Sequence, residues 1–166
     1  PVPTPAPAPY IFTSKTELNT AVLAWLNDTS AATATYGAIA TWDTSQITDM
    51  DFLFCGDPPG TWDADSGNLC DTAKANFDDD ISSWDMSSVT RTRYMFCGAS
   101  SFDQPLAAWD MSSVTTMNNM FRAASSFDQP LEAWNVGSVV WMNAVFFGAT
   151  SFDQPLSGWN VGSAMH

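Results

Sequence analysis

The sequence predicts an α/β solenoid of about five repeats, closed on its N-terminal side by a capping helix. Three observations support this prediction. Tryptophan recurs every 25 residues in the second half of the chain, apolar residues keep step with it, and an amphipathic segment precedes the first repeat. A unit of this size cannot bury its apolar side alone, whereas stacked copies bury it in ladders of like residues.

The N-terminal part of the chain divides into an arm and a capping region. Residues 1–9 read PVPTPAPAP, and this near-alternation of proline predicts an extended arm or linker. Residues 10–36 are expected to form the capping helix region. Within it, Ser14 and Glu17 have the spacing of a capping box, and an apolar stripe with near-helical spacing follows over 14–27.

The repeat array is expected over residues 37–166, with an insertion at about 57–73. The Trp42-to-Trp84 distance is 42 residues, which is one period of 25 plus 17 inserted residues. The later tryptophans keep the period without interruption: Trp84, Trp109, Trp134 and Trp159. A period in this range is typical of a leucine-rich-repeat-like solenoid, with one strand and one helical turn per repeat.

Within one repeat, three segments have distinct patterns. LAAWDM at 106–111 matches the inner strand, VTTMNNMF at 114–121 has helical spacing, and SSFDQPL at 100–106 is expected to be the return. Pro105 comes just before the expected strand, where proline is tolerated. The sequence therefore predicts inner strands and outer helical turns.

The repeat FDQPLAAWDMSSVTTMNNMF resembles that of the BspA-like leucine-rich-repeat surface proteins, including the Mycoplasma-type lipoprotein repeats. The shared pattern covers about residues 37–166 and is specific in four consecutive copies. The resemblance implies an extracellular or cell-surface protein of adhesive or structural type, and it brings no catalytic residues. The insertion and the Pro-rich start depart from the plain repeat.

Composition excludes several classes of function. With 18 acidic and five basic residues the net charge is −13, which argues against nucleic-acid partners. No apolar run is long enough for membrane insertion. The single histidine is His166, and the chain carries none of the common nucleophile, phosphate-loop or zinc-protease motifs. We therefore expect the protein not to be an enzyme.

The residue after each repeat tryptophan is the first binding candidate. These residues would line the concave face of a solenoid, as a strip for sugar, protein or Ca²⁺: Asp43, Asp85, Asp110, Asn135 and Asn160. The alternative is that each side chain bonds a nearby serine or backbone N–H. Asparagine in the later repeats favours this alternative, because a metal ladder would need the charges.

A second series of aspartates lies in the return segment. Hydrogen bonds that form turns are the expected role of Asp78, Asp103, Asp128 and Asp153. Asp78, Asp79 and Asp80 are also a weak Ca²⁺ candidate, and no other cofactor is expected.

Covalent features fit an oxidising, extracellular location. Two pairings of three cysteines are considered: Cys55–Cys70, which would close the insertion, and Cys70–Cys97, which would join it to the next repeat. Asn27 begins an N-glycosylation sequon.

The last copy, LSGWNVGSAMH, stops after the expected strand and would leave an open repeat face. We expect a protomer of an extracellular filament or matrix, joined head to tail by self-association. The expected assembly residues are Pro1, Pro3, Pro5, Trp159, Val161 and Met165. The alternative is an adhesin or binding module that recognises glycans or other surface proteins through the concave face, with or without calcium.

Overall fold

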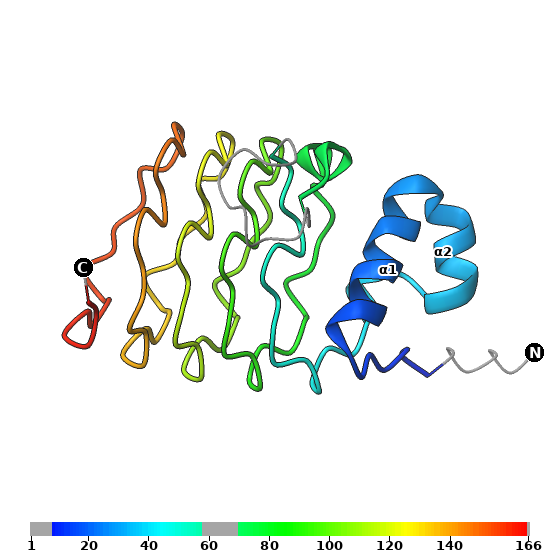
Figure 1. Ribbon diagram of the computed structural model, residues 1–166, viewed down its shortest axis with the longest axis horizontal. Coiled ribbons are helices and arrows are strands. Elements are labelled where there is room, and N and C mark those ends of the chain that lie inside the picture. The colour runs from blue at the N-terminus through cyan, green and yellow to red at the C-terminus, as the bar shows by residue number, and fades with distance from the viewer. Residues whose placement is uncertain (1–7, 58–69, 166) are drawn as a thin grey trace, which may run out of the picture.

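The computed structural model describes residues 8–57 and 70–165. The described chain contains two α-helices, α1 (Lys15–Asn27) and α2 (Thr29–Tyr36), and two short 3-10 helices, η1 (Ile39–Thr41) and η3 (Thr72–Asn76). Figure 1 shows α1 and α2 at one end of the molecule, and the repeats as a row of similar loops that leads to the C-terminal end.

Helix α1 confirms the predicted helix. Its N-cap is Ser14, whose side chain accepts a hydrogen bond from the backbone N–H of Glu17. Helix α2 was not expected. Asp28 both ends α1 and caps α2, because its carboxylate accepts from the N–H of Ala31 at 3.0 Å. The apolar face of α1 is buried toward the repeats, where the Trp25 ring meets Trp42 edge to face at 5.9 Å.

The repeats are joined by their tryptophans. Each indole N–H donates to the backbone carbonyl three residues before the tryptophan of the preceding repeat. The pairs are Trp84 to Ile39 (2.9 Å), Trp109 to Ile81 (3.1 Å), Trp134 to Leu106 (2.9 Å) and Trp159 to Leu131 (2.8 Å). A buried indole needs a partner for its N–H, so this bond fixes how far successive repeats are displaced.

Phenylalanines fill the space beside the tryptophans. Each repeat contributes a stacked pair with ring centroids 4.0–4.2 Å apart: Phe54–Phe77, Phe96–Phe102, Phe121–Phe127 and Phe146–Phe152. Each pair also stacks on the next, as Phe102 does on Phe127 at 5.9 Å. The ladders of like residues that the period predicts are therefore present.

The predicted α/β solenoid is wrong. No strand forms in residues 8–57 and 70–165, where the β-type pairing between successive repeats is limited to isolated parallel bridges. The expected inner strand at 106–111 begins as a turn, in which the N–H of Trp109 bonds the carbonyl of Leu106 at 3.1 Å. The expected helical turn at 114–121 instead contains a bridge residue, Thr116.

Left-handed residues explain why the bridges do not extend into strands. One such residue occurs ten positions after the tryptophan in each of four repeats: Phe52, Tyr94, Asn119 and Ala144, with φ between 53° and 64°. A strand needs consecutive residues in the extended region. The parallel backbone bonds therefore persist, as from the N–H of Phe54 to the carbonyl of Met95 at 2.8 Å, but along a chain of turns.

Candidate functional site

One surface of the stack carries side chains that differ from repeat to repeat. We call it the ladder face and define it as the residues seven and nine positions after each tryptophan. They are Asp49, Asp51, Arg91, Arg93, Thr116, Asn118, Trp141 and Asn143. The residues between them point inward, because Met50, Thr92 and Met117 are all buried.

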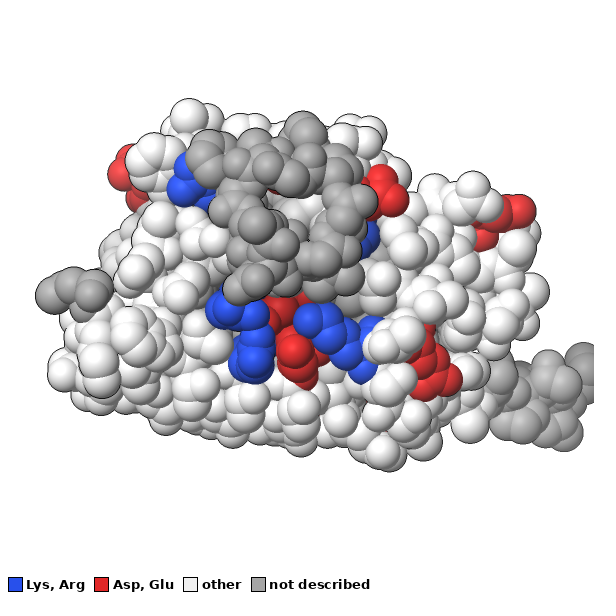
Figure 2. Space-filling model, in the orientation of Figure 1, with Lys and Arg blue, Asp and Glu red and all other residues white. Residues whose placement is uncertain are grey.

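A charged cluster occupies the first half of the ladder face (Figure 2). The carboxylate of Asp51 is buried and accepts from Nε of Arg91 at 3.0 Å and from Nε of Arg93 at 2.9 Å. Lys15 on α1 bonds Asp49 at 2.9 Å. The hydrogen bond to Asp51 raises the pKa of Arg91 further above its usual value, so this guanidinium stays charged.

The cluster is positive in a strongly negative chain. Three cations, Lys15, Arg91 and Arg93, face two carboxylates, Asp49 and Asp51, which leaves a net charge of 3 − 2 = +1. The whole chain carries −13. The cluster is therefore a local site that can attract an anion of low charge.

A shallow groove continues from the cluster. Arg91, Arg93, Thr116, Asn118 and Trp141 enclose a volume of about 370 Å³. Trp141 is 45% exposed, although large aromatic side chains are mostly covered in folded proteins. The hydroxyl oxygen of Thr116 is buried and has no hydrogen-bond partner among the described residues. The groove thus combines cations, polar groups and an open aromatic face.

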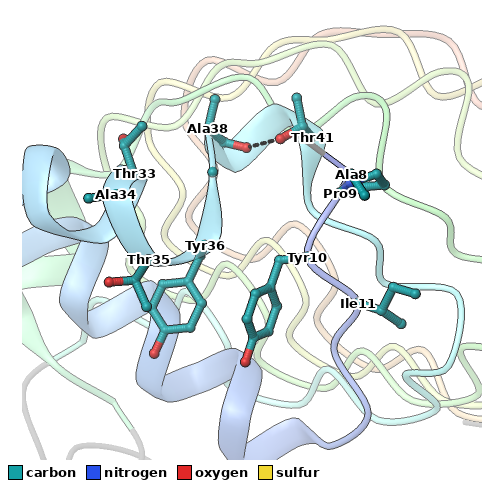
Figure 3. Close-up of a pocket in the computed structure, with 11 residues that line it drawn as sticks. Ala8, Pro9, Tyr10, Ile11, Thr33, Ala34, Thr35, Tyr36, Ala38 and Thr41 are labelled. Atoms are coloured by element: carbon teal, nitrogen blue, oxygen red, sulfur yellow. Dashed lines mark hydrogen bonds between the residues drawn. The ribbon is translucent and has the colours of Figure 1, made fainter. Parts of the chain in front are cut away.

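A larger hollow lies near the helices. It has a volume of about 970 Å³ and lies between the segment before α1 and the end of α2 (Figure 3). Tyr10 and Tyr36 lie side by side there, with ring centroids 5.0 Å apart. The Tyr10 hydroxyl donates to Glu17 at 2.8 Å. The backbone N–H of Thr13, together with this hydroxyl, lowers the pKa of the Glu17 carboxyl. None of the lining residues is charged, so this hollow offers less chemistry than the groove.

The predicted concave strip has no strand surface to carry it. Each of its five residues accepts a hydrogen bond from the backbone N–H two positions on. The acceptors are Asp43, Asp85, Asp110, Asn135 and Asn160, at 2.9–3.2 Å. Bonds from Ser45 and Ser112 lower the pKa values of Asp43 and Asp110. The alternative interpretation, local bonding, describes these contacts, while a binding role for the five stays a prediction.

The second aspartate series links repeats. Asp103 accepts from the backbone N–H of Asp128 and the side chain of Gln129, both at 2.9 Å. The same pair of bonds joins Asp78 to the following repeat, and Asp128 to the one after. These bonds run between repeats, whereas the sequence predicted hydrogen bonds that form turns.

The weak calcium candidates have separate partners. Asp78 bonds the following repeat, Asp79 accepts from the indole of Trp25 at 2.9 Å, and Asp80 accepts from the N–H of Ser82 at 2.9 Å. Among the residues that the structure describes, no three His, Cys, Asp or Glu side chains are grouped as a metal site would require.

The disulfide prediction Cys55–Cys70 is confirmed, with the Cα atoms 4.6 Å apart. Cys97 is a buried free thiol, and burial raises its pKa. Asn27 of the sequon is exposed at the end of α1.

The assembly candidates are only partly described. Val161 and Met165 are 51% and 55% exposed, and Trp159 is half-buried. Pro1, Pro3 and Pro5 lie outside the described residues, as does most of the insertion.

These features define the class: a stacked-repeat protein with a helical cap and a variable ladder face. The chain belongs to the family described as "Mycoplasma protein of unknown function, DUF285", whose model matches residues 26–59 and 64–166. Neither a curated protein nor a solved structure matches. The match supports the Mycoplasma part of the resemblance. The leucine-rich-repeat part is not supported, because the described residues form no strands.

The groove residues were not predicted. The predicted site residues occupy positions that recur with the period, whereas the groove is lined from positions that vary: Arg91, Arg93, Thr116, Asn118 and Trp141. The variation at these positions, in an otherwise regular repeat, was the signal in the sequence from which the groove could have been found. None of the described helices has the length and apolar character needed to span a membrane.

Proposed function

We propose that this chain is a binding module of the cell exterior, of adhesive type, which holds its partner on the ladder face and catalyses no reaction. The observation that carries the proposal is the groove, because an exposed Trp141 lines it together with the two arginines of the charged cluster. Concave grooves with an aromatic wall and a few convergent polar groups are the usual form of ligand sites.

The extracellular location is also a proposal. A disulfide persists in oxidising compartments, and Cys55–Cys70 is one. The sequon residue Asn27 is exposed, as glycosylation requires. The resemblance to BspA-like surface proteins also supports an extracellular location.

An adhesion assay tests this function. Beads that carry the chain would be counted on surfaces coated with glycans or with matrix proteins. We expect retention on at least one coating, reduced severalfold by Trp141→Ala. Phe147→Ala is the matched control, because Phe147 is 64% exposed and lies outside the groove. Beads retained on every coating no better than on bare surface would contradict the proposal.

Self-association into a cell-surface filament or matrix is the second candidate. It is favoured by the exposed apolar side chains, since among residues 8–57 and 70–165 four of the six large ones belong to the last two repeats: Trp141, Phe147, Val161 and Met165. Such clustering is typical of protein contact sites. Sedimentation velocity at rising concentration would show growing species if this is correct, and a constant monomer if it is not.

A further inference from the structure

We propose that the groove of the ladder face binds an acidic saccharide. The pyranose face of one sugar would lie on Trp141, and the carboxylate of its neighbour would meet Arg91 and Arg93. This inference rests on the proposed function of the ladder face as a binding surface, and it adds the chemical class of the ligand.

The aromatic wall is held in place by the backbone. The carbonyl of Trp141 accepts from the N–H of Met117 at 2.8 Å, and the N–H of Val140 bonds Thr115 at 2.8 Å. The indole therefore projects from a fixed rung while nearly half of its surface faces solvent. An apolar sugar face that covers this ring removes C–H and indole surface from water, which stabilises the complex.

The two arginines at the cationic end of the groove can bind a ligand in addition to Asp51. Arg93 reaches the buried Asp51 through Nε, so the exposed edge of its guanidinium still carries the terminal N–H donors. The Arg91 and Arg93 side chains are 43% and 35% exposed. Guanidinium groups bind carboxylates with two parallel hydrogen bonds.

The charge balance selects a sugar acid over a polyphosphate. The cluster carries one net positive charge and can neutralise one carboxylate, whereas the chain as a whole carries −13. Nucleic acids need many cationic contacts along their backbone. A saccharide with one carboxylate in every second sugar fits this balance.

Two polar groups lie between the ends of the groove. Asn118 accepts from the N–H of Asn143 at 2.9 Å through its side-chain oxygen, which fixes the carboxamide and leaves its NH₂ group to donate. Thr116 lines the groove, and its hydroxyl lacks a partner among the described residues. Sugar hydroxyls both donate and accept, so they satisfy both groups.

The spacing of the rungs matches a disaccharide. Thr116 bridges Arg91 on one side and Trp141 on the other, so the arginine and tryptophan rungs are two steps apart. With parallel chains about 4.8 Å apart, this separation is about 10 Å. A disaccharide measured end to end has about this length, so it covers the groove with its acidic ring toward the arginines and its neutral ring toward the indole.

Isothermal titration tests the proposal with hyaluronan hexasaccharide and sialyllactose as probes. Carboxyl-reduced hyaluronan and lactose serve as their uncharged counterparts. We expect binding of at least one acidic probe, roughly tenfold weaker binding of its counterpart, and a loss of about tenfold in Trp141→Ala. Asn118→Ala should weaken binding by a smaller factor than Trp141→Ala does. Phe147→Ala, the matched aromatic control, should bind like the unchanged chain.

Four outcomes would overturn the inference. Equal affinity for acidic and uncharged probes would remove the role of the arginines. Equal losses of affinity in Trp141→Ala and Phe147→Ala would show that the probe does not bind in the groove. Failure of both acidic probes, or full competition by a poly-glutamate peptide, would reject a saccharide ligand. If bead adhesion still depends on Trp141 in that case, the binding module stands and only its ligand class is wrong.

Discussion

The interior of each repeat and its ladder face follow opposite rules. In the interior, Trp109 and Trp134 occupy equivalent positions and make the same bond to the preceding repeat. On the ladder face, equivalent positions hold Asp49, Arg91, Thr116 and then Trp141. Apolar side chains that pack on a neighbouring repeat recur with the period, whereas side chains of the ladder face vary, including Asp51, which bonds two arginines of the next repeat. Periodicity here indicates structure, and departure from it marks the surface that we propose for binding.

The largest expected effect comes from the interior. Phe102 is fully buried and stacks on Phe77, Phe96 and Phe127. We predict that Phe102→Ala lowers the free energy of unfolding by about 3–5 kcal/mol, because it leaves a cavity in a continuous ladder. Urea unfolding measures the change. Phe147→Ala should cost less than about 1 kcal/mol, which is the scale of its cation–π contact with Arg122. Equal losses of unfolding free energy in the two variants would contradict the distinction between interior and surface.

The next effect concerns the first repeat, where the period is interrupted. The Cys55–Cys70 disulfide closes a loop with a sequence separation of 15. Reduction should lower the free energy of unfolding by about 3 kcal/mol, because the unfolded chain regains conformational freedom. Thermal unfolding with and without reductant measures this loss. Cys70→Ser should show the lower stability in both conditions, and a further drop on reduction would count against the account.

A smaller effect depends on pH. Burial lowers the pKa of Lys74 from 10.5 to about 8, although its ammonium group reaches the Asn19 side chain at 3.1 Å. Between pH 8 and 10 the unfolded chain therefore binds more protons than the folded one, so stability rises with pH. We predict a gain on the order of 2 kcal/mol across this window.

Lys74→Met isolates this gain from other titrating groups. The variant keeps a side chain of similar size but has no proton to lose, so its stability should rise less between pH 8 and 10. Unfolding in urea at pH 7, 8, 9 and 10 supplies the comparison. Parallel curves for the two proteins would refute the assignment.

The smallest effect belongs to the aspartates that join repeats. Bonds from the Asp153 N–H and the Gln154 side chain lower the pKa of Asp128 below 3.8. The stabilisation they give is present above the unfolded value and is lost as pH falls through the folded one. Thermal midpoints between pH 6 and 3 should fall less in Asp128→Asn, which cannot titrate. An identical fall in both proteins would assign the acid sensitivity elsewhere.

Much of the interior could be predicted from the sequence, because burial imposes a period. The phenylalanine and tryptophan ladders and the capped start of α1 at Ser14 were all visible as patterns. Helix α2 was not, since TSAATATY contains no stripe of large apolar residues and follows a segment that looks like a helix end.

The strands were mispredicted for a local reason. Phe52, Tyr94 and Ala144 adopt positive φ, which non-glycine residues other than Asn and Asp rarely do. Inter-repeat bonds hold them there, for example from the N–H of Tyr94 to the carbonyl of Asn118 at 2.9 Å. Residue preferences carry no sign of such a constraint. The groove could not be predicted from the sequence, because its residues share no motif and are brought together only when successive repeats stack.

The dissociation constant for the acidic saccharide, measured in two variants, tests the central claim most directly. Asp128→Ala removes a recurring side chain, and Trp141→Ala removes a variable one. We predict that Trp141→Ala weakens binding about tenfold at unchanged stability, while Asp128→Ala lowers the unfolding midpoint and leaves binding unchanged. Weaker binding in Asp128→Ala together with full binding in Trp141→Ala would contradict this prediction.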